Sequence, residues 1–156
     1  MRSSLDMTRV RVRGFTLIEL MVVLAIIAGL LAVAPPALQR YRESSDYRDT
    51  LRRIVAGLAE ARHASVSGGR VVAFSVDLGG RQYGVEGGRA RELPESLAVR
   101  ATVADTDLVE NVARIRFFPG GNATGGSIDV VRRSGSGARV RTDWLDGRVS
   151  IERLAE

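Results

Sequence analysis

The sequence predicts an α+β protein in which one long N-terminal α-helix packs on a C-terminal antiparallel β-sheet or β-sandwich domain. Two observations support this order. The first 67 residues combine an apolar run with a helix-periodic stretch, and glycine is rare among them. Fourteen of the 17 glycines follow residue 67, where short alternating apolar segments between turn residues replace the helical pattern.

The excess positive charge is concentrated at the N-terminus. The 156-residue chain has a formal net charge of +5, and all 23 basic residues are arginines. Residues 1–14 hold four arginines and one aspartate, which leaves the rest of the chain nearly balanced. This asymmetry favours targeting or membrane topology over a basic surface that binds nucleic acid.

An apolar segment follows the basic one. Residues 15–38 contain a single charged side chain, Glu19, and residues 20–34 are apolar on every face of a helix. The segment reaches the ~20 residues with which an α-helix crosses a bilayer. The preceding arginines predict one transmembrane helix with a cytoplasmic N-terminus and the C-terminal part on the opposite side.

A cleaved secretory signal peptide is the alternative interpretation of this segment. Residues 32–34 form an A-x-A triplet after a basic and an apolar region. However, Pro35 follows the triplet, and the tertiary amide of proline is a poor scissile bond. The carboxylate of Glu19 costs about 2.5–3.5 kcal/mol in a membrane, so a disposable segment has no use for it. We therefore predict a retained helix.

Residues 13–20, RGFTLIEL, resemble the processing site of type IV pilins and type II secretion pseudopilins. In that class a prepilin peptidase cuts after the glycine, and the new N-terminal phenylalanine is N-methylated. The resemblance implies a cleaved leader of residues 1–14, cleavage between Gly14 and Phe15, and N-methylation of Phe15. Glu19 lies one helical turn from Phe15, where its carboxylate can neutralise the terminal amine of a neighbouring subunit during assembly.

A helical stem continues the apolar helix over residues 39–67. Pro35 and Pro36 separate the two parts, and the resemblance implies a kink there that does not end the helix. The stem has a charged face, which we interpret as solvated, and Gly68-Gly69 ends it. Its apolar residues follow helical spacing and predict a core-facing side. They are Tyr47, Leu51, Ile54, Leu58 and Ala61.

Residues 68–156 are predicted to form the antiparallel β domain. Glycine-rich turns separate its short apolar alternations, and the turns at 134–137 and 146–147 suit tight hairpins. Because the domain is small, we expect the stem helix, up to about Val66, to supply much of its core. The expected strands are 70–77, 81–86, 97–103, 113–118, 127–133, 138–144 and 148–152.

Three segments narrow the resemblance to the H-type minor pseudopilins of the type II secretion system. Residues 115–131 are similar to a family signature of strand, proline-glycine turn, small polar pair, Gly-Gly and second strand. Residues 144–149, WLDGRV, resemble the final hairpin, and residues 58–64 fit the end of the helix. The implied architecture is pilin-like.

The resemblance implies a structural role, and because the sequence shows no catalytic constellation we expect that the protein is not an enzyme. A minor pseudopilin is a subunit of the periplasmic pseudopilus, which supports export of folded proteins across the outer membrane. The chain would be a single-pass protein of the bacterial inner membrane with its C-terminal domain in the periplasm. Implied partners are the prepilin peptidase, the major pseudopilin, other minor pseudopilins, the inner-membrane assembly platform and inner-membrane lipid.

A minor type IV pilin for pilus priming or DNA uptake is the alternative function. Arginines of the C-terminal segment could contact DNA phosphates. Nearby acids such as Asp129, Asp143, Asp146 and Glu152 dilute their field, so nucleic acid is an unexpected partner. The arginines concerned are Arg132, Arg133, Arg139, Arg141, Arg148 and Arg153.

No residue pattern indicates catalysis, a cofactor or a metal. The chain lacks cysteine and lysine, which excludes thiolate sites and a P-loop lysine. The single histidine, His63, lies near Ser65 and Ser67 without an acid to orient it, so we expect an ordinary residue at a helix end.

Two further groups receive structural interpretations. Asp105-Thr106-Asp107 and the pair Asp143/Asp146 lack the spacing of a Ca²⁺ loop, and we interpret them as turn caps. We expect Trp144 and Phe117-Phe118 to belong to the core.

Overall fold

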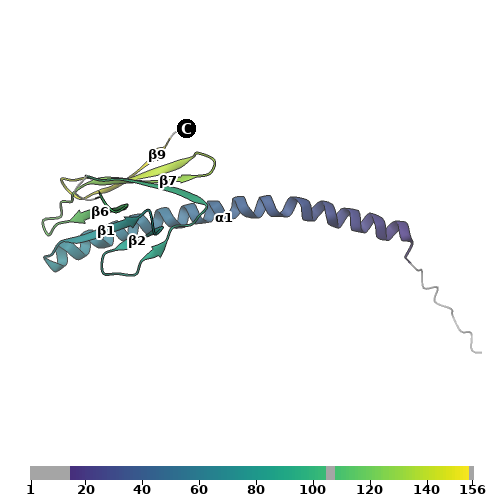
Figure 1. Ribbon diagram of the computed structural model, residues 1–156, viewed down its shortest axis with the longest axis horizontal. Coiled ribbons are helices and arrows are strands. Elements are labelled where there is room, and N and C mark those ends of the chain that lie inside the picture. Colours follow the sequence, from purple (N-terminus) through teal and green to yellow (C-terminus); the bar gives the residue numbers. More distant parts are fainter. Residues whose placement is uncertain (1–14, 105–107, 155–156) are drawn as a thin grey trace, which may run out of the picture. The chain divides into compact units, whose positions relative to one another are not determined.

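The computed structural model describes residues 15–104 and 108–154, with the backbone alone at 32–40 and 108–109. The chain forms two compact units, residues 1–39 and 40–156. Helix α1, Leu17–Gly68, begins in the first unit and continues into the second (Figure 1). The predicted leader and Gly14 lie outside the described residues.

Helix α1 contains 52 residues, and its backbone stays helical at Pro35 and Pro36. The prolines therefore do not end the helix, and the kink remains a prediction. Among the described residues, no helix has both the length and the hydropathy needed to cross a membrane.

The second half of α1 buries one face against the β domain. Leu51 is partly buried in this face, and the other four predicted positions are buried. The buried face ends at Ser65, because Val66 is already 49% exposed. The four buried residues are Tyr47, Ile54, Leu58 and Ala61.

Nine strands follow the helix in the described part of the chain. All seven predicted strands are confirmed, with ends shifted by up to two residues. The additional strands β3 and β5 have two residues each, too short for an alternating pattern to reveal them. The strands are β1 (Val72–Asp77), β2 (Gln82–Val85), β3 (Arg91–Glu92), β4 (Leu97–Thr102), β5 (Leu108–Val109), β6 (Val112–Phe117), β7 (Gly126–Arg132), β8 (Gly137–Thr142) and β9 (Val149–Leu154).

The strands form two antiparallel sheets, which confirms the predicted fold class. One sheet has the order β3-β2-β1-β6-β5 and the other the order β4-β7-β8-β9. Both lie along the C-terminal part of α1 (Figure 1). The core combines the buried helix face with inward side chains of both sheets. The sheet side chains in this core include Phe74, Phe117, Ile115, Ile128, Val130 and Val140.

Gly57 allows the helix and strand β1 to approach closely. A glycine inside a helix costs about 1 kcal/mol relative to alanine. A Cβ atom at this position would lie 2.5 Å from Cε2 of Phe74, whose side chain is fully buried. The absent side chain therefore makes room for the Phe74 ring against the helix backbone.

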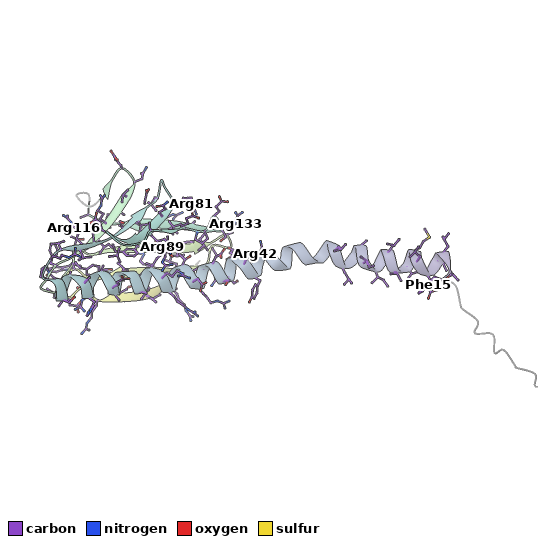
Figure 2. All side chains as sticks on the ribbon, turned by 90° about the horizontal axis from the view of Figure 1, so that it is seen from below. Phe15, Arg42, Arg81, Arg89, Arg116 and Arg133 are labelled. Atoms are coloured by element: carbon purple, nitrogen blue, oxygen red, sulfur yellow. The ribbon has the colours of Figure 1, made fainter. Side chains whose placement is uncertain are left out.

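Arg81 links the two sheets. Its guanidinium Nη2 donates a hydrogen bond of 2.8 Å to the carbonyl of Pro94 and longer ones to those of Leu93 and Leu97. Arg81, labelled in Figure 2, thus holds the segment that leads from β3 to β4. This arginine has a structural role that its sequence position did not indicate.

Candidate functional site

The first residues of α1 form a helix cap around the predicted processing site. Thr16 precedes the helix, and its Oγ1 accepts a hydrogen bond of 3.3 Å from the backbone N–H of Glu19. The pattern Thr-x-x-Glu is the capping-box signature, so Glu19 occupies the third position of the helix. The sequence contained this signal, and our sequence interpretation missed it.

Glu19 is exposed in the isolated chain, in the first helical turn. A carboxylate there is stabilised by the partial positive charge of the helix N-terminus. Cleavage before Phe15 would place an additional terminal amine in the same region. The capping geometry therefore supports a charge-related role for Glu19, whereas its pairing with a neighbouring subunit remains a prediction.

The first turns of α1 expose a continuous apolar surface. Phe15, labelled in Figure 2, is 82% exposed, and the large apolar side chains up to Leu31 that the structure describes are exposed on all sides of the helix. Apolar surface of this extent marks contact with lipid or with other proteins. This segment therefore has to be covered when the protein is in its working state.

The C-terminal end of α1 is fixed by the loop after β6. Ser65 is fully buried, and its hydroxyl donates hydrogen bonds to the carbonyls of Phe118, at 3.0 Å, and of Arg62. Arg62 in turn donates from Nε to the carbonyl of Gly121 at 3.3 Å. The loop within residues 115–131, the segment that resembles the family signature, therefore binds the C-terminal end of the helix.

Replacing Ser65 by alanine is expected to destabilise the domain by about 1–2 kcal/mol, because the carbonyl of Phe118 loses its buried donor. Ser67→Ala is the matched control, since the exposed Ser67 hydroxyl donates only to the carbonyl of His63 within the helix. Urea denaturation followed by circular dichroism measures both changes. Equal stabilities of the two variants would contradict this role of Ser65.

The outer face of the β4-β7-β8-β9 sheet carries an alternating row of charges. Arg100, Asp129, Arg139 and Glu152 are directly opposite one another on the four strands. Arg139 binds Asp129 through two hydrogen bonds of 2.7 and 2.8 Å, and this bonding raises the pKa of Arg139. Opposite charges in such cross-strand positions stabilise the sheet.

Two more of the C-terminal arginines have internal partners. The guanidinium of Arg132 lies 4.0 Å from the ring centre of Tyr47, and Arg148 forms an ion pair of 2.9 Å with Asp146. Together with Arg139, half of the six arginines considered for DNA contact are therefore engaged within the domain. The carboxylates beside Arg139 and Arg148 weaken the positive field that DNA binding requires.

The remaining candidate residues have structural positions. His63 is exposed, and the hydroxyls of Ser65 and Ser67 donate to backbone carbonyls. Asp143 accepts hydrogen bonds from the N–H groups of Leu145 and Asp146, which agrees with its interpretation as a turn cap. The segment 105–107 lies outside the described residues. Within the described residues, no group of acids and histidine could hold a metal.

The expectation that Trp144 belongs to the core is wrong. Its side chain is 66% exposed in the turn between β8 and β9, where Leu145 is equally exposed. Phe117 is fully buried as expected, and Phe118 is partly buried. Trp144 lies two residues after Thr142, the last residue of β8, within the turn to β9, so it is exposed there, which residue type alone did not predict.

Comparisons with known proteins identify both the N-terminal motif and the C-terminal domain. The model of the prokaryotic N-terminal methylation motif matches residues 9–34, and that of the type II transport protein GspH matches residues 50–146. A type II secretion system protein H from Xanthomonas campestris pv. campestris is 32% identical over 144 residues, which cover 90% of this chain and 83% of that protein. The chain belongs to the GspH family.

Solved structures show that this GspH family member has the fold of minor pseudopilins and minor pilins. The minor pseudopilin EpsH from the Type 2 Secretion System of Vibrio cholerae has a TM-score of 0.56 and 11% identity, over 71% of this chain and 99% of EpsH. The type IV minor pilin FimU of Pseudomonas aeruginosa has a TM-score of 0.54 and 14% identity, over 72% of this chain and 92% of FimU. The predicted resemblance to H-type minor pseudopilins is confirmed.

Proposed function

We propose that this chain is a minor pseudopilin, a structural subunit of the periplasmic pseudopilus of the type II secretion system. One observation carries the proposal: the long helix α1 connects a methylation motif at its N-terminal end to a GspH domain that begins in its C-terminal part. The motif supports processing, and the family supports the secretion system. The role is structural, and the described residues offer no arrangement that indicates an enzyme.

Processing is proposed at the boundary between Gly14 and Phe15, by a prepilin peptidase, followed by N-methylation of Phe15. The mature helix would then remain in the inner membrane as a single span, with the C-terminal domain in the periplasm. The exposed apolar surface from Phe15 to Leu31 supports burial in lipid before assembly and against other pseudopilins afterwards. The inner-membrane assembly platform would transfer the subunit between these two environments.

Glu19 is proposed to neutralise the terminal amine of a neighbouring subunit. We expect Glu19→Ala to leave cleavage and membrane insertion intact and to lower secretion about tenfold or more, because one charge-assisted contact is worth about 1.5–3 kcal/mol. Complementation of a strain that lacks the chromosomal copy, with immunoblots of secreted protein and of the processed subunit, measures these quantities.

Glu19→Gln is the matched control because glutamine retains the hydrogen bonds of a capping box and removes the charge. If charge pairing matters, the glutamine variant fails as the alanine variant does. Full secretion with Glu19→Gln would restrict Glu19 to helix capping, and full secretion with Glu19→Ala would refute its role in assembly.

A minor type IV pilin is the second candidate, and the fold shared with FimU supports it. The internal pairing of Arg139 and Arg148 does not favour the DNA-uptake branch of this alternative. A gel-shift assay of the processed chain in neutral detergent tests the DNA-uptake branch of this alternative. Retention of DNA at near-physiological salt would favour the DNA-uptake branch, and the absence of retention would argue against that branch.

A further inference from the structure

A hollow of about 300 Å³ lies where α1 faces strands β1, β2 and β3. The buried side chains of Phe74 and Tyr83 lie at its floor, and Gly57, Gly84 and Gly88 line it without side chains of their own. Four charged side chains line the same hollow, three of them positive. They are Arg53 on the helix, Arg89 and Arg91 on the β2–β3 side, and Glu60.

The three arginines differ from Arg81, Arg139 and Arg148 in the partners of their guanidinium groups. Arg81 binds backbone carbonyls, and Arg139 and Arg148 bind carboxylates. By contrast, within residues 15–104 and 108–154 no hydrogen bond or ion pair involves the guanidinium of Arg53, Arg89 or Arg91. Arg89 is labelled in Figure 2. These exposed donors are therefore available to an external acceptor.

Tyr83 places a further polar group near the hollow. Burial raises the pKa of its phenol, while the charges of Arg53 and Arg91 act in the opposite direction. The hydroxyl therefore stays protonated at neutral pH, within the field of both guanidinium groups. A carboxylate that reached Arg53 and Arg91 would lie close to this donor as well.

Acidic residues occupy the neighbouring surface and determine on which side of the hollow an anion can bind. An adjoining hollow of about 200 Å³ shares Arg53, Tyr83 and Arg91 with the first. The acids that line it are Asp46, Asp49 and Glu92. A bound anion is therefore repelled from this side and attracted toward Arg89, where Glu60 is the single acid lining the first hollow.

We propose that the hollow between Arg53, Arg89 and Arg91 is a docking site for an acidic segment of a protein partner. Charge complementarity selects the occupant, since guanidinium groups bind carboxylates in paired hydrogen bonds. The rings of Phe74 and Tyr83 close the floor of the hollow but are only 1% and 4% exposed, so the exposed arginines supply the contacts to the acidic segment. The inference goes beyond the proposed function, and its test does not depend on secretion.

The test uses the full chain in neutral detergent and a fluorescein-labelled peptide that contains several glutamates. Fluorescence anisotropy measures its Kd, and a peptide with glutamine in place of glutamate is the neutral comparator. We expect Arg53→Ser with Arg89→Ser to weaken binding of the acidic peptide about tenfold or more, because two charge-assisted contacts are lost. Glu60→Gln should tighten binding, and inorganic phosphate at an equal concentration of charge should leave the peptide bound.

The matched control is Arg52→Ser with Arg153→Ser, which removes the same charge from two exposed positions outside the hollow. Its Kd should stay within about twofold of the unsubstituted chain, since screened surface charges contribute little. Equal losses in both double variants, equal binding of the neutral peptide, or no binding of the acidic peptide would overturn the proposal. Displacement by phosphate would overturn it in favour of a simple anion site.

Discussion

Phe74→Ala is expected to lower the free energy of unfolding of the β domain by about 3–5 kcal/mol. The Phe74 side chain is 1% exposed and lies between Gly57 on the helix and the inner faces of the sheets. Its removal leaves a cavity that Gly57 cannot fill, because glycine has no side chain. A small domain has about 5–15 kcal/mol of total stability, so this single substitution removes a large share.

Urea denaturation of the chain in neutral detergent, followed by circular dichroism, measures the effect. Trp144→Ala is the control, because it also truncates an aromatic residue but at an exposed turn. The control should change stability by about 0.5 kcal/mol or less. A similar loss in both variants would contradict the position of Phe74 at the centre of the core.

Gly14→Val is expected to abolish processing, so the chain keeps its first 14 residues. A protease binds its substrate in an extended conformation, and a β-branched side chain next to the scissile bond obstructs the close approach that glycine allows. N-terminal sequencing and mass spectrometry of the membrane fraction would detect the uncut chain. The unsubstituted protein should begin with N-methylated Phe15.

Val12→Ala is the control for this experiment, since it changes the leader two residues before the proposed cleavage site. It should be cut normally. A mature chain that begins at Pro35 would refute the proposed processing and support a secretory signal peptide. Normal cleavage of Gly14→Val would refute only the claim that cleavage requires a glycine at position 14. Either result can be obtained without any measurement of secretion.

The order of helix and strands could be predicted because each depends on short-range patterns. The spacing from Tyr47 to Ala61 identifies the buried helix face without knowledge of its partner. The seven longer strands have enough alternating residues to show a period of two. Strands β3 and β5 have two residues each, so they exist only through pairing with a neighbouring strand.

The candidate site was predictable to different degrees along the chain. The motif around Phe15 and Glu19 is contiguous, so its residues could be named from the sequence, and the Thr16 cap could have been found there as well. The hollow lined by Arg53 and Arg89 joins residues far apart in the chain. No local pattern distinguishes these arginines from Arg81 or Arg139, whose partners come from other strands or loops.

The sequence alone was sufficient for the fold class, the family resemblance and the processing motif, since periodicity and contiguous motifs are local properties. Only the tertiary structure showed which charges are neutralised and that Trp144 is exposed. It also showed that the Phe74 ring occupies the space a side chain at position 57 would need. The physical reason is that burial and ion pairing depend on the surroundings of a residue. Those surroundings are assembled only when the helix and both sheets pack together.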